Sequence, residues 1–165
     1  MLLTYLRWKF CVGNCSYFNL AKIVIKNSYV AINTKNKSEW TALHTIAETG
    51  NIEIVKELER LNASISTVTD MGQTLLHNPA KTSFQEVCES FLKSSGDGAK
   101  DLVRMEDKDG YTAALLAAIN DHLGLMRYIQ DFDPEGPTGR LLHFTVDRDS
   151  GKLLETVLVV KLDLN

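Results

Sequence analysis

The sequence has few of the residues that interrupt regular structure, with three prolines and ten glycines in 165 residues. This argues against a long disordered tail, a class of segment that is usually rich in both. A surplus of one charge is also missing, because 18 basic and 21 acidic residues leave a net charge of −3. Nucleic-acid binding normally needs a basic stripe, so this balance gives no reason to expect a nucleic-acid partner.

Cysteine is sparse and odd in number, with Cys11, Cys15 and Cys88. Such a set is a poor disulfide framework and favours reduced thiols in an intracellular protein. Cys11 and Cys15 would lie one turn apart on a helix, but no second cysteine or histidine pair completes a zinc site. We therefore expect neither a metal nor a cofactor.

Long hydrophobic runs are absent. Residues 1–10 are largely apolar, but Arg7 and Lys9 interrupt them and no clear cleavage site follows, which is not typical of a signal peptide. The longest uncharged stretch, residues 10–21, is too short and too polar to span a bilayer. We expect a protein of the cytoplasm or the nucleus, with no membrane insertion of this chain.

A four-residue phrase is repeated along the chain at a period of 33 residues. The letters TALH at 41–44 return as TLLH at 74–77, and RLLH at 140–143 lies 99 residues, or three periods, after the first copy. A weaker copy, TAAL, stands at 112–115. A regular period of this length is typical of stacked repeats.

An apolar pattern follows each copy of the phrase. Its members are spaced by one, three and four residues, which is the spacing of a helix with one buried face. They are Ile52, Ile54, Val55 and Leu58, then Val87, Cys88 and Phe91, then Leu123, Leu125, Met126 and Ile129, and finally Leu153, Leu154 and Val157. Each copy therefore predicts a half-buried helix downstream.

Phrase, period and helical pattern together resemble the ankyrin family, whose repeat of about 33 residues carries a T-P-L-H phrase and two short antiparallel helices. The resemblance covers residues 19–165. It implies an all-α solenoid of stacked helix-turn-helix units with hairpin-like finger loops. A tetratricopeptide-type stack fits less well, because its period is about 34 and its Trp, Gly and Tyr positions are not met.

The register divides the chain into five segments. We expect a degenerate half-repeat or cap at 1–36, a first repeat at 37–69, a second repeat at 70–106 with an inserted loop at about 94–104, a shortened third repeat at 107–134 and a C-terminal repeat at 135–165. The last repeat lacks the polar outer face that a terminal repeat needs, which favours an array that continues or is covered.

The second repeat departs most from the family pattern. The proline of the T-P-L-H phrase is replaced in every copy, by Ala42, Leu75, Ala113 and Leu141. Pro79 falls inside the expected first helix of the second repeat, where it removes a backbone donor and crowds the preceding turn. The insertion predicts a long loop after this repeat, and a matching deletion predicts a clipped finger after the third. We expect the second repeat to be less stable than the first.

The resemblance also gives the constant positions structural roles. The phrase threonine can cap its helix, and the phrase histidine usually bonds the backbone of the neighbouring loop. A shared metal is excluded, because stacked helices lie roughly 8–10 Å apart whereas Zn–N bonds need about 2 Å. The phrase histidines are His44, His77 and His143. The small residues Ala47, Ala80 and Ala118 would allow close helix packing, Gly50 would end a first helix, and Gly72 and Gly110 would shape the fingers.

No catalytic constellation is complete. Asp107-x-Asp109-Gly110 has the start of a calcium loop but lacks the later glutamate. The run at 96–98 completes no phosphate-binding pattern. Asp131 and Asp133 form a close carboxylate pair of the kind found at a solvated helix end, and His122 stands where the family commonly has a helix-start residue. We expect no enzymatic activity.

The resemblance implies a partner protein bound on a concave face of finger tips and first-helix surfaces. Variable positions would form that contact. By register they are Lys37, Ser38 and Trp40 in the first finger, Asp70, Met71 and Gln73 in the second, Lys108, Asp109 and Tyr111 in the third, and Glu48, Thr49, Lys81, Thr82, Asn120, Asp147 and Arg148 at the ends of first helices.

Trp40 and Tyr111 stand out on these otherwise polar fingers. Large aromatic residues are common in binding hot spots, although each could instead pack over the next finger and stiffen it. The mixed signs of the surrounding charges imply neither a strongly acidic nor a strongly basic partner.

Two functions are compatible with these features. One is a scaffold or adaptor that binds proteins and has no chemistry of its own, a class that includes an inhibitor mimicking a host ankyrin protein. The alternative is the cytosolic ankyrin segment of a larger chain, such as an ion channel or a toxin-like protein. The end of the chain, Asp163-Leu164-Asn165, also resembles the site that asparagine hydroxylases modify in ankyrin proteins.

Overall fold

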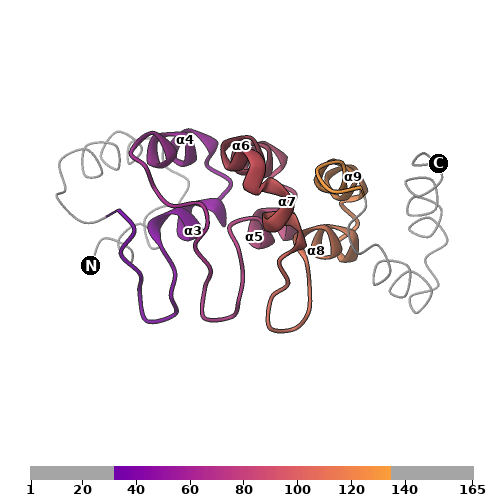
Figure 1. Ribbon diagram of the computed structural model, residues 1–165, viewed down its shortest axis with the longest axis horizontal. Helices are drawn as coiled ribbons and strands as arrows, with labels where there is room; N and C mark the ends of the chain where they lie inside the picture. The colour runs from indigo at the N-terminus through magenta and orange to yellow at the C-terminus, as the bar shows by residue number, and fades with distance from the viewer. Residues whose placement is uncertain (1–31, 135–165) are drawn as a thin grey trace.

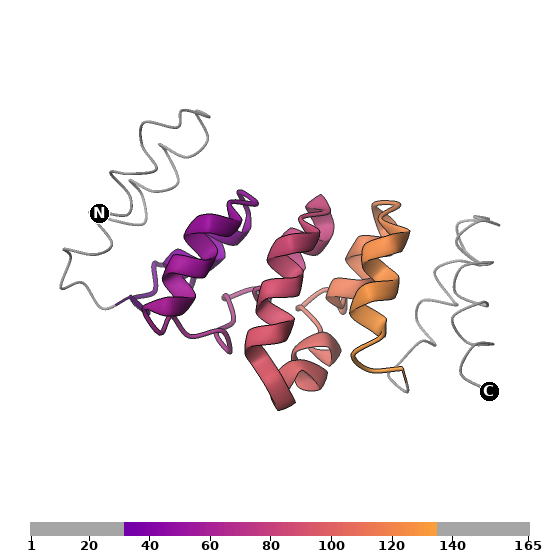
Figure 2. The same cartoon turned by 90° about the horizontal axis from the view of Figure 1, so that it is seen from above.

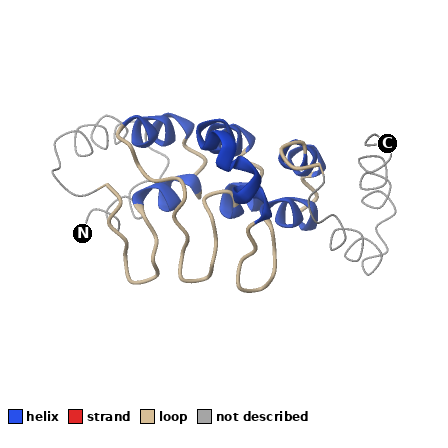
Figure 3. Ribbon diagram, viewed as in Figure 1, coloured by secondary structure: helices blue, strands red, loops and turns tan. Residues whose placement is uncertain are grey.

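A computed structural model of the chain describes residues 32–134. Within this range the protein is helical and has no strand, which confirms the all-α fold (Figure 3). The main helices come in pairs, α3 (Ala42–Ala47) with α4 (Ile52–Arg60), α5 (His77–Thr82) with α6 (Gln85–Ser95), and α8 (Ala113–Ile119) with α9 (Leu123–Gln130). Figure 1 shows α3, α5 and α8 in an inner row, α4, α6 and α9 in an outer row, and hairpin fingers projecting from the inner row.

The inner helices are short and almost wholly buried. Every residue of α3 is buried, and so is most of the alanine- and leucine-rich α8. Small side chains allow neighbouring helices to approach closely, and α5 packs against both α3 and α8. Ala47, Ala80 and Ala118, the small positions of the repeat, lie in this layer and are at most 4% exposed.

The outer helices bury one face each, as the apolar pattern predicts. In α4 the buried residues are Ile54, Val55 and Leu58; in α6 they are Val87, Cys88, Phe91 and Leu92; and in α9 they are Leu125, Met126, Ile129 and Gln130. The helices lie side by side when seen from above (Figure 2), and α4 packs against α6. Each outer helix also packs on its own inner helix, so one continuous core runs along the stack.

The phrase threonine caps two of the three inner helices. Thr41 accepts from His44 N–H in a capping box, and Thr112 accepts from Leu115 N–H at 3.2 Å. The second copy differs, because α5 begins at His77 and has no side-chain cap. The expected position of Pro79 inside this helix is confirmed, but the proline costs the helix little there. Pro79 is the third residue of α5, in the first turn, where a backbone N–H has no intrahelical acceptor to lose.

The inserted segment of the second repeat is helical, so the predicted loop at about 94–104 is wrong. A 3-10 turn, η1 (Gly96–Gly98), follows α6 and leads into α7 (Ala99–Arg104). Ala99, Leu102 and Val103 are buried in the core cluster. Their spacing of three and four residues is that of a buried helical face, so the insertion is helical because it carries apolar side chains of its own.

A salt bridge between Arg104 and Asp133 links the insertion to the third repeat. Arg104 donates from Nε and Nη2 to the two oxygens of Asp133, at 2.5 and 2.8 Å. The hydrogen bond from Arg104 is the main reason that the pKa of Asp133 lies below its usual value. Asp133 is 6% exposed, so its predicted position at a solvated helix end is wrong, whereas Asp131 is exposed.

Removing the charge of Asp133 should weaken this salt bridge. We expect Asp133→Asn to lower the free energy of unfolding by about 1–2 kcal/mol, because two charge-assisted hydrogen bonds are weakened while the half-exposed Arg104 regains water. Urea unfolding would measure the loss, with Asp131→Asn as the matched control. Equal effects of the two variants would contradict the prediction.

Several predicted features lie outside residues 32–134. They include the N-terminal cap, the clipped finger and the C-terminal repeat. The residues concerned are Cys11, Cys15, His143, Asp147, Arg148 and Asn165. The division of the chain into segments at 37, 70, 107 and 135 stays a prediction.

Candidate functional site

The fingers of the described part share one backbone plan. In each, an N–H near the start donates to the carbonyl four residues later, from Asn36 to Trp40 at 2.9 Å, from Thr69 to Gln73 at 3.0 Å and from Asp107 to Tyr111 at 2.9 Å. The residue before the last has a positive φ, 60° at Glu39, 74° at Gly72 and 80° at Gly110. The two glycines have the finger role that the resemblance implied, while Glu39 adopts the same conformation with a side chain.

Replacing Glu39 by glycine should stabilise the first finger. A left-handed backbone costs a non-glycine residue roughly 1–2 kcal/mol, and the exposed Lys35–Glu39 ion pair, at 2.8 Å, offsets little of that. We expect Glu39→Gly to raise the free energy of unfolding by about 0.5–1 kcal/mol. Thermal unfolding would measure the gain, and Lys35→Ala would measure the ion pair alone. A lower melting temperature for Glu39→Gly would contradict the prediction.

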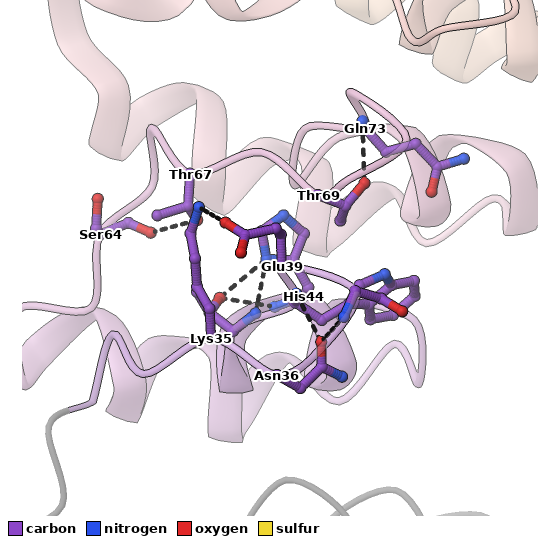
Figure 4. A network of polar contacts seen from close by, with 11 residues as sticks. Lys35, Asn36, Glu39, His44, Ser64, Thr67, Thr69 and Gln73 are labelled. Atoms are coloured by element: carbon purple, nitrogen blue, oxygen red, sulfur yellow. Dashed lines mark hydrogen bonds and ion pairs between the residues drawn. The ribbon is translucent and has the colours of Figure 1, made fainter.

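A side chain at the first position of each finger braces the turn. Asn36 Oδ1 accepts from the N–H groups of Ser38 and Trp40, both at 2.9 Å (Figure 4). Thr69 Oγ1 accepts from Gln73 N–H at 3.2 Å. Sequence analysis missed this set, although the signal was present as a short oxygen-bearing side chain at one register position.

Asp107 occupies the same bracing position in the third finger. Its Oδ1 accepts from the N–H groups of Asp109 and Tyr111, at 3.0 and 2.9 Å. The resemblance of this segment to the start of a calcium loop therefore has a structural explanation, because the carboxylate binds its own backbone. Among residues 32–134, no group of three or more His, Cys, Asp or Glu side chains is arranged to hold a metal.

Successive fingers are hydrogen-bonded to one another near their tips. Asp70 N–H donates to the Ser38 carbonyl at 3.1 Å, and Lys108 N–H donates to the Met71 carbonyl at 2.9 Å. The backbone of these four residues is thus used in stacking, while their side chains are exposed. Four predicted contact residues from three fingers therefore form one row with a fixed spacing.

The aromatic residues Trp40 and Tyr111 lie at equivalent positions in the first and third fingers, with Gln73 between them in register. All three are partly buried. The ring centroid of Trp40 lies 6.0 Å from that of His44, and Tyr111 packs against the core. Both aromatic residues therefore help to hold their own fingers, and both keep some exposed surface. Packing of each ring over the next finger stays a prediction.

The phrase histidines of the described part, His44 and His77, are buried, and each ring is hydrogen-bonded to the threonine of its phrase. His77 Nδ1 accepts from Thr74 N–H at 3.0 Å, and its Nε2 lies 2.9 Å from the Tyr111 carbonyl. The ring must therefore be neutral with its proton on Nε2, which then donates to the next finger. This confirms for His77 the predicted bond to a neighbouring loop.

His44 repeats the arrangement less completely. Its Nδ1 accepts from Thr41 N–H at 3.3 Å, but Nε2 has no hydrogen bond of good geometry. Burial disfavours the charged form of the ring and lowers the pKa of His44 to about 4. The Gln73 backbone acts in the opposite direction and offsets only part of this shift. Burial also lowers the pKa of His77. Both histidines are neutral structural groups.

The polar side chains at the ends of the inner helices serve the backbone. Thr49 Oγ1 donates to the Ile46 carbonyl at 2.7 Å, Thr82 Oγ1 to the Asn78 carbonyl at 3.0 Å, and Asn120 Nδ2 to the Leu116 carbonyl at 2.8 Å. The Ile46 and Leu116 carbonyls also accept a backbone N–H, from Thr49 and Asn120, so these side chains reinforce the last turn of each helix.

The two charged residues predicted at these helix ends, Glu48 and Lys81, are exposed. The carbonyl of Lys81 lies 3.2 Å from Nε2 of His122, the N-cap residue of α9. His122 therefore stands at a helix start, as expected, and also joins the third repeat to the second.

Comparison with known proteins agrees with this geometry. A family model described as ankyrin repeats, in three copies, matches residues 10–101, which is more than half of the chain. No curated protein gives a significant match to the sequence. In the part of the chain that the structure describes, none of the helices has the length and apolar character needed to cross a membrane.

Proposed function

The chain belongs to the ankyrin-repeat family, and we propose that it is a protein-binding module, a scaffold or adaptor that holds a protein partner on its fingers and inner-helix ends. Ankyrin repeats are generally protein-interaction modules and are typically non-catalytic. We propose accordingly that the chain has no enzymatic activity and acts in the cytoplasm or the nucleus.

The observation that carries this proposal is the hydrogen-bonded row of fingers. Its backbone groups are paired within each finger and between neighbouring fingers, so a partner would meet a surface that loses little conformational entropy on binding. The exposed side chains of Lys37, Ser38, Asp70, Lys108 and Asp109 give this row both signs of charge. With both signs present, the row would select a partner whose charges are arranged in a complementary pattern, and would not attract proteins simply because of their net charge.

Apolar contact would come from three side chains along the row. Met71 at the tip of the second finger is 45% exposed, and a flexible methionine adapts to different partner surfaces. Trp40 and Tyr111 would contribute their remaining exposed faces. At the helix ends the site would be bordered by Glu48, Thr49, Lys81, Thr82 and Asn120. In the fourth repeat we propose the same role for Asp147 and Arg148.

Charge reversal at the finger tips would test the proposal without touching the core. The variant Lys37→Glu, Met71→Glu, Lys108→Glu changes three exposed side chains whose side-chain atoms make no hydrogen bond in residues 32–134. Lys56→Glu with Lys100→Glu, at exposed positions of α4 and α7, is the matched control. We expect proteins captured from lysate by wild type and by the control to be lost from the finger variant by at least about tenfold, or roughly 1.4 kcal/mol.

Circular dichroism and thermal unfolding must first show that all three proteins are folded. Equal capture by the finger variant would overturn the finger surface as the binding site. Absence of any specific capture by folded wild type would overturn the scaffold proposal itself.

A further inference from the structure

The insertion of the second repeat forms a groove away from the fingers. The groove has a volume of about 380 Å³ and lies between the loop after α4, the end of α6 and the segment 98–105. None of its lining residues belongs to a finger tip or an inner helix. Its volume is at the lower end of the range of about 300–1,000 Å³ for ligand sites, so it has room for a few side chains and not for a folded domain.

The floor of the groove is apolar. Ala63, Ile65 and Leu102 line it and are buried or partly buried, and Met105 stands at its edge with 38% of its surface exposed. Met105 and Met71 are the exposed large apolar side chains of the described part of the chain. A flexible thioether beside an apolar floor suits an aliphatic side chain, because methionine repacks around different shapes.

The charge of the groove is negative. Asp101 is the charged residue that lines it, and its carboxylate makes no side-chain hydrogen bond or ion pair within residues 32–134. The nearest arginine on α7, Arg104, is held by Asp133 on the side of the third repeat. The other cation of α7, Lys100, is not among the residues that line the groove, and neither is Arg104. The carboxylate of Asp101 therefore has no cationic neighbour in the groove lining.

The remaining rim can serve a peptide backbone. Ser94 is exposed at the groove, while Ser95 donates its hydroxyl to the Phe91 carbonyl at 2.7 Å and keeps its oxygen as an acceptor. Gly98 opens the rim, since a Cβ built there would meet nothing within 4 Å. An extended chain could therefore lie across the groove with its polar groups at the serines.

We propose that this groove is a second binding site, which takes an extended peptide segment with an aliphatic side chain next to a lysine or arginine. The aliphatic side chain would lie on Ile65, Leu102 and Met105, and the basic side chain would pair with Asp101. The site goes beyond the finger surface and does not depend on it.

Short peptides and the full 165-residue chain would test this directly. The probe is an acetylated, amidated hexapeptide with Leu-Arg at its centre, titrated against labelled protein by NMR. Matched peptides carry Leu-Glu or Ser-Arg at the same place. We expect shift changes at Gly98, Leu102 and Met105 with a Kd of about 1 mM, and at least about fivefold weaker binding of both matched peptides.

Two variants check that the signal comes from the groove. Gly98→Phe should fill the groove without disturbing the fold, because Gly98 has an ordinary φ of −76° and open space around it. Asp101→Lys should reverse the preference, so that the Leu-Glu peptide binds better than the Leu-Arg peptide. The finger variant described above should bind the Leu-Arg peptide as wild type does, which separates this site from the finger surface.

The proposal would be overturned by an absence of shift changes at these residues at about 5 mM peptide, about fivefold above the expected Kd. Equal binding of the Leu-Arg and Leu-Glu peptides would overturn it as well, and so would unchanged binding by folded Gly98→Phe protein.

Discussion

Acidification from pH 6.5 towards pH 4 should destabilise the folded chain by up to about 3 kcal/mol through His44 alone. Burial lowers the pKa of this histidine from 6.5 to about 4. In the unfolded chain His44 would gain a proton below pH 6.5, while the folded chain resists it. The stabilising contribution is therefore fully present above pH 6.5 and is lost as the pH falls towards 4. His77, whose pKa is lowered for the same reason, acts in the same direction.

Urea unfolding at a series of pH values between 7.5 and about 4 would measure this loss. The carboxylate of Asp133 has its pKa lowered from 3.8, so its own contribution is lost below that value and outside the window. His44→Gln is the control, since it removes the titrating ring and should flatten part of the pH dependence. A wild-type stability that stays constant from pH 7 to 4.5 would contradict the assignment of a buried, neutral His44.

Substitution of Gly50 by alanine should cost roughly 2–4 kcal/mol, because two penalties act at one position. Gly50 lies in the turn after α3, with φ +72°, a conformation that disfavours any side chain. A Cβ at this position would also lie 2.6 Å from ring carbons of Phe84, which packs against the core. The new methyl group can be accommodated only if the ring and its neighbours move.

The equivalent position of the second repeat provides the matched control. Ser83 ends α5 with φ +62°, so Ser83→Gly should relieve a strain of the kind that Gly50→Ala creates. We expect Ser83→Gly to raise the free energy of unfolding by about 0.5–1 kcal/mol. Chemical denaturation of both variants would decide the matter. A loss below about 0.5 kcal/mol for Gly50→Ala would show that neither penalty operates.

Local features of the repeat were predictable, because each depends on residues close together in the chain. The threonine caps at Thr41 and Thr112 need only the first turn of their own helices. The buried faces of the outer helices follow from apolar spacing alone. The contact residues predicted on fingers are exposed or partly buried where the structure describes them, although binding by any of them stays a prediction.

Errors arose where a distant segment decides the outcome. The helical state of the insertion depends on burial of Leu102 and Val103 in the common core. The buried environment of Asp133 depends on Arg104, 29 residues earlier in the chain. No periodicity reveals such a pairing, because neither residue belongs to the repeated pattern.

The sequence by itself determined that this chain is a stack of helical repeats, because period, apolar spacing and capping residues all act within one repeat unit. Only the tertiary structure decided how the units meet. It determined that finger backbones pair from Asp70 to Ser38 and from Lys108 to Met71, and that an insertion creates a groove beside Asp101. These features depend on atoms from different repeats, whose distances are set by packing and not by spacing along the chain.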